Sequence, residues 1–195
     1  FYRNTTDEME FFVEKQQITI GSETQDIFAS TIANIGDYTT SGTELGVSYK
    51  PFNWWNMYGE IVLNGFKQRG SFRGASFDGD GLLVSGRYNT TFNFFKSMKF
   101  QIQNYYRGPI ETGQYRRKGF YGMNIGISND LFKGNGSIAF NIRDVFNSNK
   151  RLVTTFGPDF TRDLELQYRV RQINLSLTYR FNQKQHKGKK GNQYE

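Results

Sequence analysis

Residue types that carry enzymatic chemistry are scarce in this sequence. Its 195 residues contain no cysteine and a single histidine, His186, which lies among lysines close to the end of the chain. Thiolate metal sites, cysteine nucleophiles and a histidine-based triad are therefore excluded from the rest of the chain. We expect a protein that is not an enzyme and that has neither a cofactor nor a metal site.

Two glycine-containing stretches have spacings that resemble the start of a ligand loop. In FDGDG, Asp78 and Asp80 stand two residues apart, but the later oxygen ligands of a calcium loop do not follow. In FKGNGS, around Gly134, there is no following Gly-Lys-Ser pattern to cradle a phosphate. We interpret both stretches as turns.

The remaining candidates for chemistry are arginine and tyrosine side chains in the long polar stretches 67–80, 107–119 and 147–167. Guanidinium groups suit anionic chelates through charge-assisted hydrogen bonds, and aromatic rings stack on sugars. The alternative is that these are solvated residues which bind lipopolysaccharide headgroups or nothing. The candidate ligand-binding residues are Arg69, Arg73, Tyr115, Arg116, Arg117 and Arg162.

The polar stretches separate segments in which apolar and polar residues alternate strictly. In NLSLTYRF, for example, the apolar residues are two apart, and this period places them on one face of a strand. Connections that are short, such as KPFN, FFKSM and DLFKGNG, alternate with the long ones, which is typical of an up-and-down meander. The sequence predicts an all-β chain with eight strands at residues 1–15, 33–50, 53–67, 80–95, 97–108, 118–130, 136–147 and 167–181.

The length and faces of these strands favour a transmembrane antiparallel β-barrel. The mean hydropathy is −0.67, and no apolar run approaches the roughly 20 residues of a membrane helix. The strands are long enough to cross a bilayer when tilted, and aromatic residues gather at their ends as in membrane girdles. A soluble β-barrel binding module is the alternative. The polar face suits a wet lumen, because unpaired buried charge is costly; its charged members are Glu44, Glu60, Arg87, Arg143 and Arg180.

The net charge of +7 does not indicate a nucleic-acid partner, because the basic residues follow no single face. The last segment alone carries Lys184, Lys187, Lys189 and Lys190 against Glu195. We predict a barrel segment at residues 1–181 and a basic, disordered periplasmic tail at residues 182–195. The first residues, FYRN, contain no initiator methionine or signal segment, and we interpret this end as cut by processing or fragmentation.

Several stretches resemble the final third of a TonB-dependent receptor of the outer-membrane β-barrel family. They are FYRNTTDEMEFF, ANIGDYTTSGTELGVSYKPFNWW, NYYRGPIETGQYR and GISNDLFKGNGSIAFNIRDVFNSNKR. The most specific pieces are the NIG…SGTEL run at residues 34–45 and the IRDVFN run at residues 142–147. NLSLTYRF also resembles the closing strand of such barrels, which the barrel assembly machinery recognises; the matching residues are Leu175, Leu177, Tyr179 and Phe181.

The resemblance implies an outer-membrane importer in which a barrel of about 22 strands encloses a plug that contacts the TonB energy-transducing complex. It also implies a periplasmic C-terminus, contact with outer-membrane lipid, and a metal chelate (siderophore), glycan or peptide as ligand. This chain departs from the pattern, because it has no plug, no TonB-contacting box and too few strands. The alternative is a self-contained eight-stranded barrel with a structural or adhesion role. If eight strands close alone, residues 18–28 are expected in a loop at the same end as residues 107–119.

Overall fold

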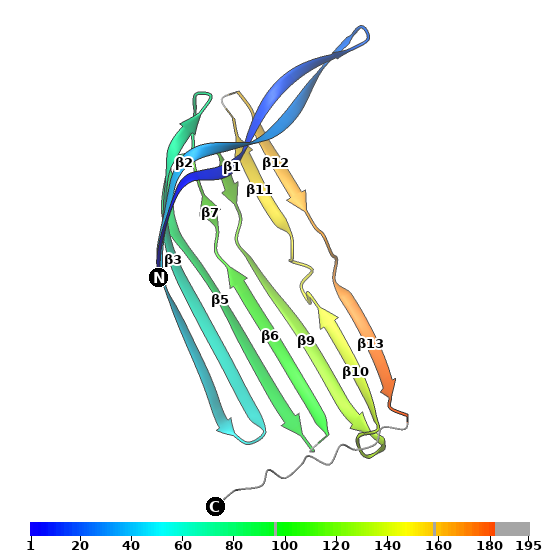
Figure 1. The fold of residues 1–195 in the computed structure, drawn as a ribbon. Helices are drawn as coiled ribbons and strands as arrows, with labels where there is room; N and C mark the ends of the chain where they lie inside the picture. Colours follow the sequence, from blue (N-terminus) through cyan, green and yellow to red (C-terminus); the bar gives the residue numbers. More distant parts are fainter. Residues whose placement is uncertain (96, 158, 182–195) are drawn as a thin grey trace, which may run out of the picture.

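The computed structural model describes residues 1–95, 97–157 and 159–181, and eight long antiparallel strands form its main sheet (Figure 1). The neighbours follow chain order, so the predicted all-β meander is confirmed. The short strand β4 (Ala75–Ser76) pairs only with β3. None of the described residues forms a helix long and apolar enough to span a membrane. The eight strands are β1 (Tyr2–Ile20), β2 (Glu23–Phe52), β3 (Trp55–Phe72), β5 (Gly79–Phe94), β6 (Met98–Arg107), β9 (Phe120–Leu131), β10 (Gly136–Arg143) and β13 (Gln172–Tyr179).

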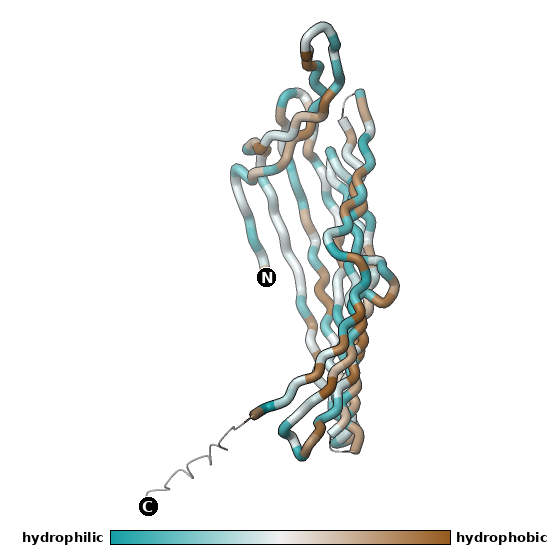
Figure 2. The backbone as a smooth tube through the Cα atoms, turned by 90° about the vertical axis from the view of Figure 1, so that its right-hand side faces the viewer, coloured by the Kyte–Doolittle hydropathy of each residue, from teal (hydrophilic) through white to brown (hydrophobic). Residues whose placement is uncertain are grey.

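The main sheet has one apolar and one polar face, as the alternation predicts. Directly paired residues share a face of a sheet, and the ladder Ile127↔Phe140↔Leu175 joins apolar side chains across three strands. These side chains point away from the protein, since Leu175 is 70% exposed and Leu177 is 72% exposed. Figure 2 shows the resulting alternation of apolar and polar residues along the strands.

The end of the sheet with the short connections carries a belt of aromatic side chains. The turn between β2 and β3 stacks Trp54 on Phe52 with ring centroids 5.2 Å apart, and Trp55 lies 5.6 Å from Phe92 on β5. Between β9 and β10, the 3₁₀ turn η1 (Phe132–Gly134) places the Phe132 ring 5.6 Å from Tyr179. Aromatic rings at the end of an apolar band fit the headgroup level of a membrane.

At the opposite end, which we call the mouth, the prediction of irregular loops was wrong. The long connections form a small sheet in the order β12 (Thr161–Leu166), β11 (Arg151–Phe156), β8 (Tyr115–Arg117) and β7 (Ile110–Glu111). Two main strands are shorter than the predicted ranges 136–147 and 167–181: β10 ends at Arg143 and β13 begins at Gln172. These short strands were missed because threonine and charged residues blur their alternation.

On the small sheet, the continuation of the apolar face is charged. Arg116 pairs with Glu111 at 2.7 Å, and Lys150 pairs with Glu165 at 2.6 Å. Five of the six ion pairs among the described residues lie at the mouth, and the sixth lies on the polar face of the main sheet. Because charged side chains are costly against lipid, this change from apolar to charged side chains marks the level at which the wall leaves an apolar environment.

The strands β1 and β2 extend beyond the mouth as a bent hairpin (Figures 1 and 2). The bend coincides with bulges on both sides of the Glu8↔Gly36 pair, and Asp7, next to this pair, has a positive φ of 55°. A Cβ on Gly36 would lie 2.1 Å from the Arg69 carbonyl oxygen, so the close approach of these backbones requires glycine. The bent hairpin packs against residues 72–77. The buried core formed there contains Phe12, Ala33, Ile35 and Phe77, with Phe72 and Ala75 packed against it.

This hairpin also answers the conditional prediction for residues 18–28. They do not form a loop but continue the β1–β2 ladder to a turn at Gly21 and Ser22. Nor do the eight strands close into a barrel by strand pairing: β1 and β13 are the edges of the main sheet, and no ladder joins them within the described ranges. The predicted tail at residues 182–195, with His186, lies outside the described residues.

Candidate functional site

The polar face of the main sheet carries a band of amide side chains, which we call the amide belt. It arises from two neighbouring rows of cross-strand partners. One row runs Asn89↔Gln103↔Asn124, and the next runs Gln101↔Gly126↔Asn141. Strand β13 continues both rows, because Gln172 pairs with Arg143 and Asn174 pairs with Asn141. The amide belt comprises Asn89, Gln101, Gln103, Asn124, Asn141, Gln172 and Asn174.

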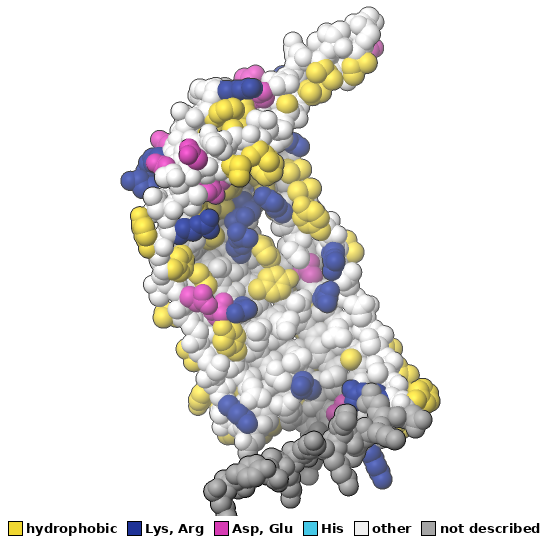
Figure 3. All heavy atoms as spheres, in the orientation of Figure 1, with side chains coloured by type: hydrophobic (Ala, Val, Ile, Leu, Met, Phe, Trp, Pro, Cys, Tyr) yellow, Lys and Arg dark blue, Asp and Glu magenta, His cyan; other side chains and the backbone are white. Residues whose placement is uncertain are grey.

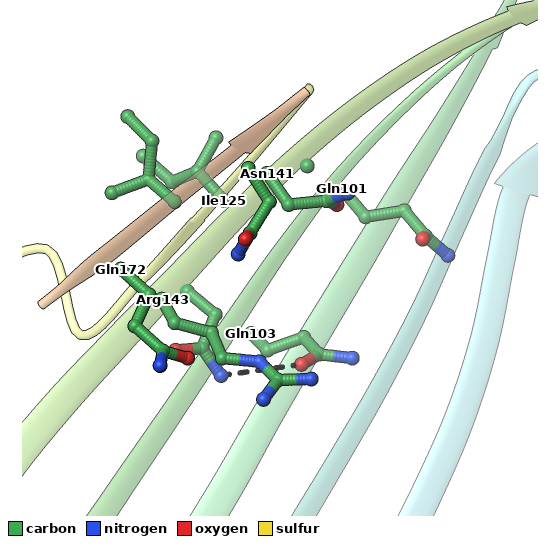
Figure 4. A pocket seen from close by; sticks show the side chains of 10 residues that line it. Gln101, Gln103, Ile125, Asn141, Arg143 and Gln172 are labelled. Atoms are coloured by element: carbon green, nitrogen blue, oxygen red, sulfur yellow. Dashed lines mark hydrogen bonds between the residues drawn. The ribbon is translucent and has the colours of Figure 1, made fainter. Parts of the chain in front are cut away.

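A cavity of about 500 Å³ lies over part of the amide belt. Figure 4 shows Gln103, Arg143 and Gln172 directed toward one region, with Gln101 and Asn141 beside it. Asn124 donates a hydrogen bond of 3.4 Å to Gln103, and Gln101 donates one of 3.3 Å to Thr91. Amides offer both donors and acceptors, so this surface suits neutral polar ligands such as sugars or peptide groups.

The predicted charged residues of the polar face occupy that face in different ways. Glu60 and Arg87 are direct ladder partners and form an ion pair of 2.6 Å, and Arg87 also lies over the Tyr58 ring. Arg143 lines the amide cavity, whereas Arg180 donates to the carbonyl oxygen of Gly134 in the turn at the far end. Glu44 pairs with Val62 on the same face as Glu60.

A second cavity, of about 310 Å³, lies at the mouth between the β1–β2 hairpin and the small sheet; we call it the arginine pocket. The hairpin contributes Glu10, Phe11 and Val13 to its wall, and Gln114 donates a hydrogen bond of 3.4 Å to the Val13 carbonyl oxygen. The polar face of the small sheet contributes Tyr115, Arg151, Val153, Thr155, Arg162, Leu164 and Leu166. Figure 3 looks onto the hollowed face, where Lys and Arg side chains gather toward the mouth.

The electrostatics of the arginine pocket are dominated by positive charge. Burial lowers the pKa of the Arg117 guanidinium, and the positive charges of Arg107 and Arg151 lower it further. Burial, followed by the charge of Glu8, raises the pKa of the Glu10 carboxyl at the pocket wall. The guanidinium groups at the pocket therefore oppose further positive charge, and Glu10 is the one carboxyl among the lining residues.

The structure divides the six candidate ligand-binding residues into two sets. Tyr115 and Arg162 line the arginine pocket, and Arg117 lies on the same face of the small sheet as Tyr115. The other three are held in local contacts: Arg69 pairs with Asp80, Arg73 pairs with Glu14, and Arg116 pairs with Glu111 on the opposite face.

Sequence reasoning missed Arg151 and Arg107, which approach Arg117 closely enough to change its pKa. Apolar and polar residues do not alternate in RLVTTF, since Arg151, Val153 and Thr155 share one face of β11, so alternation alone does not reveal this strand.

FKGNGS forms a turn as predicted, but the same prediction for FDGDG was wrong, because Gly79, Asp80 and Gly81 begin strand β5 and the turn lies earlier, at Arg73 and Gly74. Asp78 accepts a hydrogen bond of 2.9 Å from the backbone N–H of Gly70, and Asp80 pairs with Arg69. In the η1 turn, Lys133 and Gly134 have positive φ angles of 54° and 93°. In the part of the chain that the structure describes, no three His, Cys, Asp or Glu side chains group as a metal site would require.

Where the main sheet meets the small sheet, the IRDVFN run forms a hydrogen-bonded turn around the buried Asp144; we call this turn the IRDVFN knot. The Asp144 carboxylate is 5% exposed and accepts the backbone N–H groups of Ser148 at 2.9 Å and Asn149 at 3.0 Å. Its own N–H donates to Asn124 of the amide belt at 2.9 Å. Asn147 in turn accepts from the backbone N–H of Arg171 at 3.0 Å, which ties the knot to the entrance of β13.

The apolar residues of the last strand lie on the outward, apolar face. Leu175 and Leu177 project from β13, and the Tyr179 ring contacts the Phe181 ring with centroids 4.6 Å apart. This is the surface that the predicted assembly signal requires, since an alternating apolar edge strand must be reachable from outside the sheet.

Comparison with known proteins agrees with this geometry. No curated protein and no solved structure matches the chain. A family model described as the outer membrane protein beta-barrel family matches residues 1–179. That range contains all the strands of both sheets, the amide belt and the IRDVFN knot. The outward apolar face, the aromatic belt and the charged mouth are the features expected of such a wall, and the chain belongs to the outer membrane protein beta-barrel family.

Proposed function

We propose that this chain is the C-terminal barrel segment of a TonB-dependent receptor that imports a metal chelate such as a siderophore, a glycan or a peptide. The observation that carries the proposal is the open wall, whose edge strands β1 and β13 have no mutual ladder among the described residues. A barrel of eight strands is just wide enough for side chains to fill its interior, whereas about 22 strands enclose a plugged lumen. The cavity of about 500 Å³ over the amide belt supports the wider lumen.

The proposal places the mouth outside the cell and the C-terminus in the periplasm. The charged small sheet and the long connections at the mouth support this orientation, because long loops of bacterial barrels are extracellular. In this proposal the outward face contacts lipid, the barrel assembly machinery recognises β13, and a plug absent from this chain contacts the TonB complex. Nucleic acid is not a partner, and no catalytic step is assigned to the chain.

Two contacts favour a second candidate, the self-contained eight-stranded barrel. The Phe28 ring of the β1–β2 hairpin lies 5.1 Å from the Phe160 ring, and the Arg162 guanidinium lies 5.3 Å above Phe28. These contacts join the two opposite sides of the wall at the mouth without backbone pairing. A structural or adhesion role would follow from this candidate.

The native size of the protein distinguishes the two candidates. We would run outer-membrane fractions with and without heating and detect the protein with an antibody against residues 183–195. The proposal predicts a heat-modifiable band several times heavier than the 22.7 kDa of this chain. A heat-modifiable band near 22.7 kDa would replace the importer with the self-contained barrel. Recovery of the protein in the soluble fraction without detergent would contradict both.

A further inference from the structure

The arginine pocket contains more positive charge than the protein neutralises. Among the described residues, Arg107, Arg117 and Arg151 take part in none of the six ion pairs, although Arg117 is half-buried. The Nε atom of Arg117 is buried and has no hydrogen-bond partner. A buried donor without a partner is costly, and more so when it carries charge.

The cross-strand register explains why these arginines gather. Arg117 on β8 pairs with Val153 on β11, and Arg151 is two residues from Val153, so both arginines point to the polar face. Arg107, at the end of β6, approaches from the main sheet and affects Arg117 electrostatically. Arg162 on β12 adds a further guanidinium at the pocket wall. Arg151 and Arg162 thus line the cavity, Arg117 shares the face of the small sheet that forms its wall, and Arg107 lies within electrostatic reach of Arg117.

Other polar groups near Arg117 supply less negative charge than the arginines carry positive charge. The phenol of Tyr115 lies within electrostatic reach of Arg117, and burial raises its pKa, so that it stays neutral. Glu10 is the one carboxyl among the residues that line the pocket, where its single charge faces the guanidinium groups of Arg151 and Arg162. Gln114, which is buried, is engaged with the Val13 carbonyl oxygen.

The remaining wall of the pocket is apolar. Phe11 and Val13 line it from the hairpin, and Val153, Leu164 and Leu166 line it from the small sheet. Guanidinium groups recognise phosphate and carboxylate oxygens through paired hydrogen bonds. An apolar surface beside them favours a ligand whose anionic group is attached to an apolar or aromatic body.

We propose that the arginine pocket binds a soluble ligand that carries a phosphate, sulfonate or carboxylate group on an apolar body, with the oxyanion held by Arg107, Arg117 and Arg151. The pocket opens on the polar face and not on the face toward lipid, so its ligand comes from solution. This inference deepens the proposed function and rests on it, because the pocket would be the first contact of an imported ligand at the mouth.

The test measures binding of 2-naphthyl phosphate to the purified full-length protein in detergent by calorimetry. We expect saturable binding at one site that weakens as salt is raised. Uncharged 2-naphthol should bind at least tenfold more weakly, and so should inorganic phosphate, which lacks the apolar body. An excess of inorganic phosphate should compete only weakly. Phosphatidic acid added to the micelles should not compete, and displacement by it would overturn the soluble source of the ligand.

Neighbouring arginines provide a matched control. Arg117→Gln and Arg151→Gln should each weaken binding at least tenfold, whereas Arg116→Gln should change it less than twofold, because Arg116 points to the opposite face and pairs with Glu111. Heat-modifiability of each variant verifies that it is folded. Equal effects of Arg116→Gln and Arg117→Gln, or no binding by the folded protein, would overturn the site. A heavy native band without naphthyl phosphate binding would leave the importer standing and remove only the site. Binding of naphthyl phosphate together with a native band near the mass of the chain would leave the site standing and remove only the importer.

Discussion

At the scale of single residues, Asp144 combines several structural constraints. It combines a buried carboxylate with a positive φ of 53°, and its oxygens hold the chain that leaves β10. The same segment binds Asn124 on β9 and the entrance of β13. The segment that contains Asp144 and Asn147 therefore connects three strands of the main sheet at the level where the small sheet begins.

Replacing Asp144 by alanine should destabilise this junction by about 3 kcal/mol, because two part-buried backbone N–H groups lose a charged acceptor. Asp144→Asn should cost about 1 kcal/mol, since asparagine tolerates the positive φ and keeps one acceptor oxygen. The measurement is the temperature at which the native band converts to the denatured band on electrophoresis. Equal conversion temperatures for wild type and Asp144→Ala would show that the knot contributes nothing to stability.

At the scale of elements, the faces of the strands decide which substitutions the wall tolerates. Phe140 on β10 lies between Ile127 and Leu175 on the apolar face, and its neighbour Asn141 lies in the amide belt. Each strand thus presents one residue to an apolar environment and the next to a polar one. A charged residue is therefore costly at one position of a strand and tolerated at the next position.

Phe140→Arg should reduce the amount of folded protein in the outer membrane strongly, because arginine on the lipid face costs about 2–4 kcal/mol near the midplane. Asn141→Arg should leave that amount within about a factor of two, because the polar face is solvated. Quantitative blotting of washed outer membranes with and without heating gives both values. If the two variants were depleted to the same extent, the assignment of the faces would be wrong.

At the scale of the whole molecule, the two ends of the sheet differ in chemistry. One end has tight turns and stacked aromatic rings, and the other has the charged small sheet, the arginine pocket and the projecting hairpin. The proposed orientation puts the mouth outside the cell. Because the sequence contains no cysteine, single introduced cysteines report this orientation without background labelling from the chain.

Ser22→Cys lies at the turn of the β1–β2 hairpin, and Asn53→Cys lies at the turn between β2 and β3. A membrane-impermeant maleimide should label Ser22→Cys on intact cells and should label Asn53→Cys only after the outer membrane is permeabilised. Both sites are exposed, so a difference in labelling reports the side of the membrane. Labelling of Asn53→Cys alone on intact cells would place the C-terminal end of β13 outside and reverse the orientation.

The sequence by itself determined the number and order of the eight main strands, their apolar and polar faces, and the end of the sheet with short turns. The physical reason is that strand alternation is a local property with a period of two residues, so it can be read without knowing the partner strand. The outward position of Leu175 and the polar position of Asn141 follow from this rule alone. Their ladder partners agree with it.

Only the tertiary structure decided which polar residues meet. Arg116 and Arg117 are adjacent in sequence, yet one forms an ion pair on the outer side and the other joins Arg107 and Arg151. The bulges beside the Glu8↔Gly36 pair bend the hairpin, and the short strands of the small sheet pair residues far apart in the chain. These features depend on non-local partners and on close backbone approach, which no local periodicity encodes. The arginine pocket is therefore a property of the fold, although each of its side chains is visible in the sequence.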